Sequence, residues 1–401
     1  MATPQLSPGV LTREVDLTVG RADNVLDNIG AIAGPFPIGP VDYPIDITTE
    51  QDLINVFGKP ISSDSQYEYW MSASSYLSYG GVLKVVRTSG STLNNANAGV
   101  GIASTTVLEI DNYDDYTSNH SDATNFTYSA KNPGSWGNGL KVCFIDDLAD
   151  QTLGITTTSL VALGATVGYG VTVALSNTVI AGSGSTSLFT GYLKGIITGV
   201  TTDSTNGNST IDVKIVSRVS SAGTETAITY SEGTTTSAFA ASSTIKFINN
   251  SGAQSGSATV ASISDWYGNQ TLGLTNTTIY WKSIAPKPVS NIYSLDRNGK
   301  NDGLHIVVVD DLGTITGNQG TIIEKHVGLS KALDAISAVN SPQKIWYKQY
   351  LADFSAQIYA GNNPSSAADS YWGTTPRATG FSTAFTAITT ANGLWGQSAQ
   401  G

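Results

Sequence analysis

The sequence has little cysteine, little charge and few basic residues. A single cysteine in 401 residues excludes an internal disulfide framework and a zinc site built from cysteines. Charged residues make up only 13% of the chain, and 31 acidic residues outnumber 20 Lys and Arg, which gives a net charge of −11. A surface that follows nucleic-acid phosphates needs clustered Lys and Arg. We therefore expect no nucleic-acid partner, and acidic substrates are disfavoured.

Long apolar runs are absent as well. Nowhere do about 18 apolar residues follow one another, and the N-terminus, MATPQLSPGV, has no basic segment followed by an apolar one. We expect no membrane insertion and a chain that is cytosolic when made. What the sequence has instead is 42 glycines and long Ser/Thr stretches, a composition that favours sheets and turns over exposed helices.

Changes of pattern along the chain predict an α/β (α+β) fold. Apolar and polar residues alternate near the N-terminus, as in an extended arm that adds a strand to another molecule. Strand and helix signals follow, whereas the middle of the chain is rich in Thr, Ser, Gly, Val and Ile and reads as short strands and turns. We expect a discontinuous α/β domain with an inserted all-β barrel or sandwich. The predicted regions are the arm (1–20), the discontinuous domain (21–98 plus 263–401), a β connection (99–150) and the insertion (151–262).

Some elements can be placed more closely. Thr48 or Thr49 can cap a helix that runs to about Phe57, where Gly58 and Pro60 stop it. Low-complexity disorder is the alternative for residues 201–260, although Ile and Val recur there at alternate positions. Further expected elements are a helix at 67–79, strands at 29–34, 82–87, 305–311 and 321–330, and the start of a helix in KALDAISAV, residues 331–339.

The rare reactive side chains give weak catalytic signals. Cys143 with His120, His305 or His326 could form a nucleophile and base, but Cys143 lies in the apolar alternation LKVCFI, where a small buried thiol is the ordinary outcome. The three histidines have no metal-ligand spacing. We expect no cofactor and no metal.

Acidic residues gather at three places. The first cluster could bind a hard cation, but its spacing fails the EF-hand loop, and a solvated loop is favoured. Two doublets end apolar strands, where catalytic carboxylates occur, yet such doublets are also good turn starters. We favour turns, with an acid/base hydrolase that uses Asp146 or Asp310 as the lesser alternative. The residues are Glu109, Asp111, Asp114 and Asp115 in the cluster, and Asp146-Asp147 and Asp310-Asp311 in the doublets.

Aromatic residues are plentiful, with 18 tyrosines and 7 tryptophans. On an Asn/Thr-rich β surface they could stack on sugar rings, but they are equally suited to cores and interfaces. A carbohydrate-binding β-rich adhesin or surface-decoration protein is therefore an open alternative.

One stretch resembles a known family. The run PGSWGN, followed by Leu140 and Val142, is similar to a hallmark of tail sheath proteins from contractile-tailed (myovirus) bacteriophages. Its residues are Pro133, Gly134, Ser135, Trp136, Gly137 and Asn138. Other segments look like the same family in the same order: SPGVLTREVD, GPFPIGP followed by ITTEQDLINVFGKP, YLSYGGVLKVVR, IAPKP and HIVVVDDLGTITGNQGTIIEKHVGLSKALDA. The resemblance spans residues 6–148 and 263–360 and is nearest to sheath proteins of phages that infect cyanobacteria.

The resemblance implies a structural protein and no enzyme. Sheath subunits polymerise around the inner tail tube in the virion tail, after assembly in the host cytoplasm, and contract to drive the tube through the host envelope for genome delivery. The implied partners are other copies of the chain, the tail tube protein, the baseplate and the tail terminator. The insertion would be the protruding domain of the family. The arm that pairs with a neighbouring subunit would contain Leu11, Arg13, Val15 and Leu17.

In that setting PGSWGN is expected to be a tight backbone turn. Trp136 would pack beside the strand LKVCFI, and Gly134, Gly137 and Gly139 would adopt conformations that other residues resist. Family members continue into further α/β sequence, a Gly-Gly-x-Asp-Gly segment and a C-terminal domain, none of which this sequence matches. The chain is therefore expected to be the N-terminal part of the family's full length and to be monomeric on its own.

Overall fold

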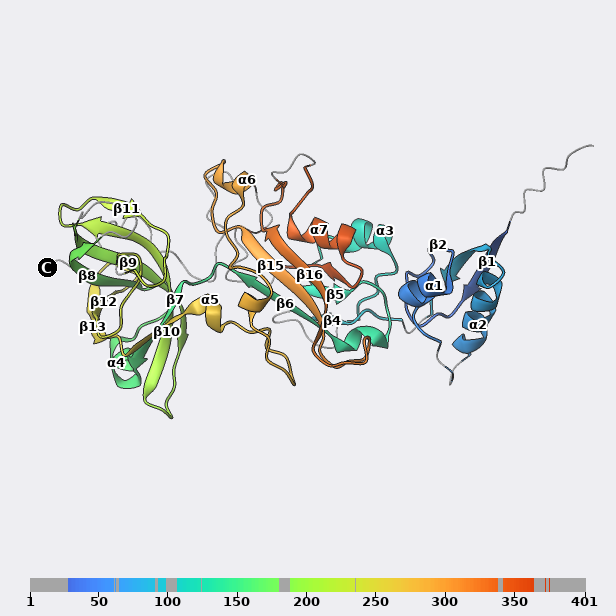
Figure 1. The fold of residues 1–401 in the computed structure, drawn as a ribbon, viewed down its shortest axis with the longest axis horizontal. Helices are drawn as coiled ribbons and strands as arrows, with labels where there is room; N and C mark the ends of the chain where they lie inside the picture. Colours follow the sequence, from blue (N-terminus) through green and yellow to red (C-terminus); the bar gives the residue numbers. More distant parts are fainter. Residues whose placement is uncertain are drawn as a thin grey trace, which may run out of the picture. The chain divides into compact units, whose positions relative to one another are not determined.

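A computed structural model describes residues 28–60, 62, 65–90, 93–98, 107–123, 125–179, 188–234, 236–337, 342–363, 372 and 375. The chain divides into two compact units, Met1–Pro37 with Tyr43–Thr88 and Ile38–Asp42 with Ser89–Gly401. The smaller unit combines a sheet with two helices and the larger unit is sheet-rich with short helices, so the protein is mixed α+β, in line with the predicted class (Figure 1). None of the helices among the described residues has the length and apolar character to cross a membrane.

The smaller unit is a three-stranded sheet with two helices. β1 (Ile29–Gly34) runs parallel to the central strand β3 (Val82–Arg87), which pairs antiparallel with β2 (Ile45–Ile47). Helices α1 (Glu50–Phe57) and α2 (Gln66–Leu77) contribute buried side chains to the same core as the sheet. The helices predicted at both places are therefore confirmed.

The ends of α1 follow from its capping residues. Thr49 has an extended backbone, and its side-chain oxygen accepts a hydrogen bond from the Asp52 N–H at 3.1 Å. Gly58 ends the helix with φ 81°, in the region that favours glycine, and its N–H donates to the Ile54 carbonyl. The Nε1–H of Trp70 on α2 donates to the Gly58 carbonyl at 2.9 Å, which ties the second helix to the end of the first.

The larger unit contains a three-stranded antiparallel sheet with the order β16 (Thr321–Ser330), β15 (Gly303–Asp310) and β6 (Leu140–Asp146). All eight residues of β15 are buried because the strand is covered on both faces. The two faces of β15 contribute to different apolar clusters. One face packs with α7 (Tyr347–Phe354) through Leu304, Ile306 and Val308, and the other face contributes Val307 and Val309 to a second cluster.

Short elements surround this sheet. A second three-stranded sheet has the order β17 (Ile358–Ala360), β5 (Tyr128–Ala130) and β4 (Asn97–Ala98). The short helices are α3 (Tyr113–Asp115), a π-helix (Tyr116–His120), α5 (Trp266–Asn269), a 3-10 helix (Trp281–Ser283) and α6 (Ile292–Leu295).

The prediction that a helix starts in KALDAISAV is wrong. Its described residues, 331–337, form turns and one isolated bridge between Ile336 and Lys344. The Ser337 N–H donates to the Gln343 carbonyl at 2.8 Å, and the Ala335 carbonyl accepts the Ile345 N–H at 3.0 Å, so these groups pair with a second extended segment and not along a helix. Tertiary contacts therefore override the helix propensity of this stretch.

The middle of the chain forms an antiparallel sheet of eight strands in the order β13-β12-β8-β9-β10-β7-β14, with β11 paired to β10 (Figure 1). Among the described residues the outer strands β13 and β14 do not pair, so the sheet is open and the predicted barrel is not confirmed. The elements are β7 (Gln151–Thr156), α4 (Thr157–Leu163), β8 (Gly170–Val179), β9 (Leu188–Thr201), β10 (Asn208–Ser220), β11 (Glu225–Ala227), β12 (Thr244–Ile248), β13 (Gln254–Thr259) and β14 (Ser262–Asp265).

One apolar core holds this sheet together. Alternate residues of β10, such as Ile211, Val213 and Ile215, are buried with side chains from β7, β8, β9 and β12. Strands β10 to β13 all lie within the segment for which disorder was the alternative, so the alternation of Ile and Val predicted strands there correctly. The limits of the four predicted regions stay predictions.

The capping of α1 gives a first testable prediction. Thr49→Ala removes the oxygen that accepts the Asp52 N–H and should destabilise α1 by about 1 kcal/mol. Native-state hydrogen exchange of the α1 amides in the full chain would measure the loss. Thr49→Ser keeps the acceptor and should exchange like the parent protein; equal exchange in Thr49→Ala and the parent would contradict the role of the cap.

Candidate functional sites at the motif turn and the acidic strand ends

The PGSWGN segment is a turn followed by one 3-10 helix, Ser135–Gly139, that leads directly into β6. Gly134 has φ 134°, a backbone conformation that favours glycine. Trp136 is half-buried, and its Nε1–H donates to the Asn132 carbonyl at 3.1 Å. The remaining motif residues are Pro133 and Gly137, which are buried, and Ser135 and Asn138, which are exposed.

Gly137 and Gly139 are required for a different reason from the one predicted. Neither has a positive φ, so the expectation of special backbone conformations holds only for Gly134. A Cβ on Gly137 would lie 2.8 Å from the Cβ of Ala130, and one on Gly139 would lie 2.1 Å from Oγ1 of Thr314. The missing side chains instead allow close packing of the turn against its neighbours.

The loop between β15 and β16 is one of those neighbours, and Asp310 organises it. The buried carboxylate of Asp310 accepts hydrogen bonds from the N–H groups of Thr314, Ile315 and Thr316 at 3.0, 2.9 and 2.7 Å, and from the Thr316 hydroxyl at 2.9 Å. Burial by itself would raise the pKa of Asp310, but these donors outweigh it and hold the pKa below its ordinary value. Asp310 therefore acts as a turn former, as its place at a strand end predicted.

Asp311 connects the same loop to two further segments. Its N–H donates to the Gly139 carbonyl at 3.0 Å, which joins the loop to the motif turn. Its carboxylate accepts from the N–H and hydroxyl of Thr275 at 2.9 and 2.7 Å and lies 3.6 Å from the Lys141 ammonium. Burial opposes ionisation here too, but the Thr275 donors and Lys141 keep the pKa of Asp311 below its ordinary value. The structure thus brings together two segments that carry the family resemblance.

The role of Asp310 yields a second prediction. Asp310→Asn removes the charge that four donors share and should cost about 1–3 kcal/mol of unfolding free energy at neutral pH. Because the folded pKa is lowered, the stabilisation is fully present above the unfolded pKa of about 3.9 and is lost as pH falls through the folded pKa.

Thermal unfolding of both proteins from neutral to acidic pH would measure this difference. The difference in unfolding temperature between the parent and Asp310→Asn should narrow below about pH 4. Asp296→Asn, at an exposed carboxylate in the same unit, is the control and should show no gap. A gap that does not depend on pH would contradict the ionised role of Asp310.

Asp146 pairs with a lysine that is fully buried. The Lys331 Nζ lies 2.7 Å from Oδ2 of Asp146 and 4.8 Å from the centre of the Trp372 ring. Lys331 has 0% exposure, so the pair compensates a charge that would otherwise be buried alone. This assigns Asp146 a structural partner and a place at the end of β6.

Asp147 forms a second and larger charge cluster with Asp150, which we call the lysine clamp. The Lys214 Nζ lies 2.5 Å from Asp147 Oδ1 and 3.2 Å from Asp150 Oδ1. The Lys287 Nζ lies 2.7 Å from Asp147 Oδ1 and 2.6 Å from Asp150 Oδ1. Two carboxylates and two ammonium groups therefore neutralise one another.

The clamp is also tied to the backbone around it. The second oxygen of Asp150 accepts the Ile215 N–H at 2.8 Å, and the Asp150 carbonyl accepts the Trp266 N–H at 3.1 Å. Burial alone would lower the pKa of Lys287, but the carboxylates of Asp150 and Asp147 hold it above its ordinary value. The clamp joins the segment that follows β6 to β10 and to the segment that returns from the insertion.

Removing one member of the clamp gives a third prediction. Asp150 is 4% exposed, and Asp150→Ala would leave Lys214 and Lys287 with one carboxylate and the Ile215 N–H without its acceptor. Breaking such a buried pair should cost about 3–5 kcal/mol. Urea denaturation followed by tryptophan fluorescence would measure the loss, with Asp296→Ala as the control. A loss no greater than that of the control would show that water already screens the clamp.

The cysteine and histidines do not form a nucleophile and base. The buried Cys143 thiol donates to the Leu272 carbonyl, and burial raises its pKa to about 11, which disfavours the thiolate. His305 accepts the Gly328 N–H at Nδ1 and lies 2.9 Å from the Pro286 carbonyl at Nε2, which assigns the proton to Nε2. The other two histidines pair with carboxylates, His326 with Glu324 and His120 with Asp115.

The acidic cluster at 109–115 is an organised loop. Asp115 accepts the Asp111 N–H and the Asn119 side-chain amide, and Asn112 caps the short helix by accepting the Asp115 N–H. Burial and the charge of Glu109 raise the pKa of Asp111. Within the part of the chain that the structure describes, no group of three or more His, Cys, Asp or Glu residues is arranged to hold a metal ion.

The predicted arm cannot be compared with the structure. Leu11, Arg13, Val15 and Leu17 lie outside the described residues. Their role in contacts between subunits stays a prediction, as does the role of PGSWGN as a family motif.

Sequence reasoning missed the lysine clamp. Lys214 and Lys287 stand 64 and 137 residues from Asp150 along the chain. Their local contexts, DVKIV and APKPV, show only a lysine in a strand pattern and a lysine between prolines. The one local signal was the acidic residues that follow an apolar strand, which predicted a turn but not its partners.

Two known proteins are similar to part of this chain, while no protein-family model matches it. Over 82 residues the chain is 38% identical to the tail sheath protein of Enterobacteria phage T4, and over 84 residues it is 36% identical to the tail sheath protein of Vibrio phage KVP40. Each match covers 20% of this chain and 12% of the relative's length. The similarity supports the tail-sheath resemblance and gives no support to a cyanobacterial origin.

Proposed function

We propose that this chain is a structural protein of a phage virion. More particularly, it is a subunit of a contractile tail sheath. The similarity of part of the chain to two phage tail sheath proteins carries the proposal. The ordered resemblance of several separate segments, from SPGVLTREVD to the strand that begins HIVVVDD, adds to it.

In this role the chain polymerises around the inner tail tube and contracts to drive the tube through the host envelope for genome delivery. Its partners are other copies of itself, the tail tube protein, the baseplate and the tail terminator. Assembly takes place in the host cytoplasm, and the proposed source is a phage of cyanobacteria. Contacts that repeat from one copy to the next build open helical arrays, and strand addition by the arm at Leu11–Leu17 would keep neighbours connected.

The interior of the larger unit suits a subunit that moves as a body. A sheath that changes its packing needs a subunit whose own fold persists through the change. The lysine clamp and the Asp146–Lys331 pair place charges where separation of the segments would leave them uncompensated. These contacts favour movement at surfaces between copies over movement inside the described part of the unit.

Immunogold electron microscopy tests the proposal on the particle itself. An antibody raised against residues 150–260 would be applied to lysates that contain the phage, with tails imaged before and after contraction. We expect gold along the whole tail, with the spacing between particles reduced as the tail shortens.

The same images test the rival function. Gold confined to the tail tip or to cell surfaces would reject the sheath and favour an adhesin or surface-decoration protein. Pre-immune serum on the same samples serves as the control, because it should leave tails unlabelled before and after contraction.

A further inference from the structure

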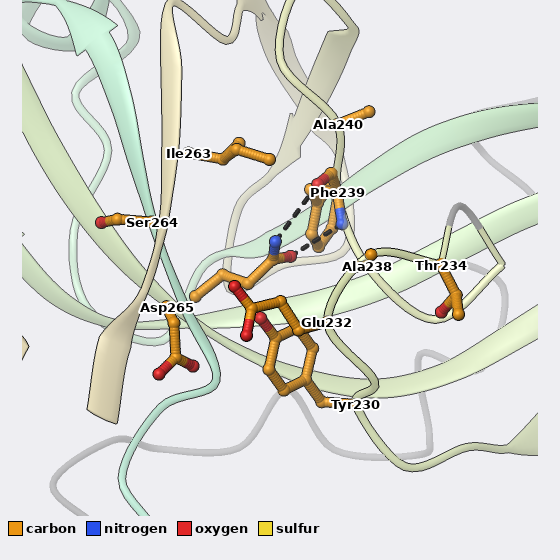
Figure 2. Close-up of a pocket in the computed structure, with 11 residues that line it drawn as sticks. Tyr230, Glu232, Thr234, Ala238, Phe239, Ala240, Ile263, Ser264 and Asp265 are labelled. Atoms are coloured by element: carbon orange, nitrogen blue, oxygen red, sulfur yellow. Dashed lines mark hydrogen bonds between the residues drawn. The ribbon is translucent and has the colours of Figure 1, made fainter. Parts of the chain in front are cut away.

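The insertion contains a pocket of about 240 Å³ (Figure 2). It lies between β14, the start of β7 and the loop that connects β11 to β12. This volume is below the roughly 300–1,000 Å³ of pockets that hold drug-sized ligands, so it suits a single small ring. The residues that matter for its chemistry are Gln151, Tyr230, Glu232, Thr234, Ile263 and Asp265.

The wall of the pocket is fixed by a buried glutamine. Gln151, at the first position of β7, is 3% exposed. Its Nε2–H donates to the Phe239 carbonyl at 3.2 Å, and its Oε1 accepts the Phe239 N–H at 2.7 Å, as the dashed lines of Figure 2 show. The Phe239 side chain is buried in the apolar core of the insertion. The loop is therefore held in place before any ligand binds, which reduces the ordering cost of binding.

The charges of the pocket select against anions. Glu232 and Asp265 both line it, and the described lining contains no Lys or Arg. Within the described part of the chain the Glu232 carboxylate has no hydrogen-bond or ion-pair partner. Oδ2 of Asp265 accepts the Gly268 N–H at 2.7 Å, which orients that carboxylate and leaves acceptor capacity on it. A ligand that donates hydrogen bonds is favoured over phosphate or carboxylate groups.

Tyr230 adds an aromatic face and a hydroxyl beside the carboxylates (Figure 2). Burial, Asp265 and Glu232 raise the pKa of Tyr230 to about 12, so the phenol keeps its proton and can donate. An apolar ring surface next to several fixed polar groups is the combination that orients a small ligand in a pocket. A ring with an apolar face and hydroxyls on its rim matches both features.

We propose that this pocket binds one neutral sugar ring. The ring packs against Tyr230, and its hydroxyls donate to the carboxylates of Glu232 and Asp265. A single pyranose unit, free or at the end of a glycan, is the class of ligand. This site goes beyond the proposed sheath function, since a sheath subunit needs no sugar to assemble.

Saturation-transfer difference NMR on the full chain tests the site. The probes are the methyl glycosides of glucose, mannose and galactose, together with N-acetylglucosamine; glucose 6-phosphate is the anionic comparison. At least one neutral probe should receive saturation and give a measurable Kd by titration. Glucose 6-phosphate should bind at least tenfold more weakly than the best neutral probe.

Two variants and two controls locate the binding. Tyr230→Ala and Glu232→Gln should each weaken binding of the best probe at least tenfold. Tyr79→Ala and Glu68→Gln change an exposed tyrosine and an exposed glutamate in the smaller unit and should leave the Kd within a factor of two. Thermal unfolding midpoints would confirm that the variants fold; because Glu232 is exposed, Glu232→Gln tests the site even where Tyr230→Ala does not fold.

Three results would overturn the proposal. No saturation of any neutral probe would show that the pocket holds no sugar ring. An unchanged Kd in Glu232→Gln would place the binding elsewhere. Binding of glucose 6-phosphate as tight as that of the best neutral probe would contradict the argument from charge. None of these results affects the immunogold test of the sheath.

Discussion

The insertion depends on four charges at its base. Asp147 and Asp150 stand just before β7, and their carboxylates bind Lys214 from β10 and Lys287 from the segment that follows the insertion. Taking these charges out of water is costly, and the cost is offset only while all four groups stay together. The start of the insertion, β10 and the return segment are therefore held at one point. The Ile215 N–H also donates to the Asp150 carboxylate, and the Trp266 N–H donates to the Asp150 carbonyl.

The same principle recurs across the larger unit. Asp146 compensates the buried Lys331, and Asp310 and Asp311 hold the loop between β15 and β16 against the motif turn. A chain in which only 13% of residues are charged thus places several of those charges in its interior. The exposed surface is correspondingly rich in Ser, Thr, Asn and Gly. Because the buried pairs are balanced, the net charge of −11 lies outside them, so a subunit proposed to pack against copies of itself has to keep its exposed carboxylates apart or pair them.

Local chemistry made some of this structure predictable from the sequence. Thr49 and Gly58 bracket α1 as capping residues should, and the doublet Asp310-Asp311 starts a turn. These predictions held because the partners of Thr49, Gly58 and Asp310 lie within six positions along the chain, although those of Asp311 do not. The family resemblance led in the same way to Gly134, whose positive φ is a local property.

Long-range packing accounts for the predictions that failed. Gly137 and Gly139 are glycines because Ala130 and Thr314 lie against them. KALDAISAV is not a helix because its Ser337 N–H and Ala335 carbonyl pair with Gln343 and Ile345. Neither cause is visible in the local sequence. The open sheet of the insertion differs from the predicted barrel in the same way, since alternation fixes which side chains are buried but not whether the outer strands β13 and β14 meet.

The pocket and the lysine clamp share their structural support. Gln151, which fixes the pocket wall, directly follows Asp150, and Asp265, which lines the pocket, directly precedes Trp266, whose N–H bonds to the Asp150 carbonyl. The start of β7 and the end of β14 are thus joined by the hydrogen bond between Asp150 and Trp266, each of which is next to a residue that lines the pocket. Asp265 is therefore positioned at a strand end, whereas Tyr230 and Glu232 lie in the loop between β11 and β12, which the hydrogen bonds between Gln151 and Phe239 hold. This placement explains how a β-rich insertion with long loops could present a fixed set of groups to a small ring.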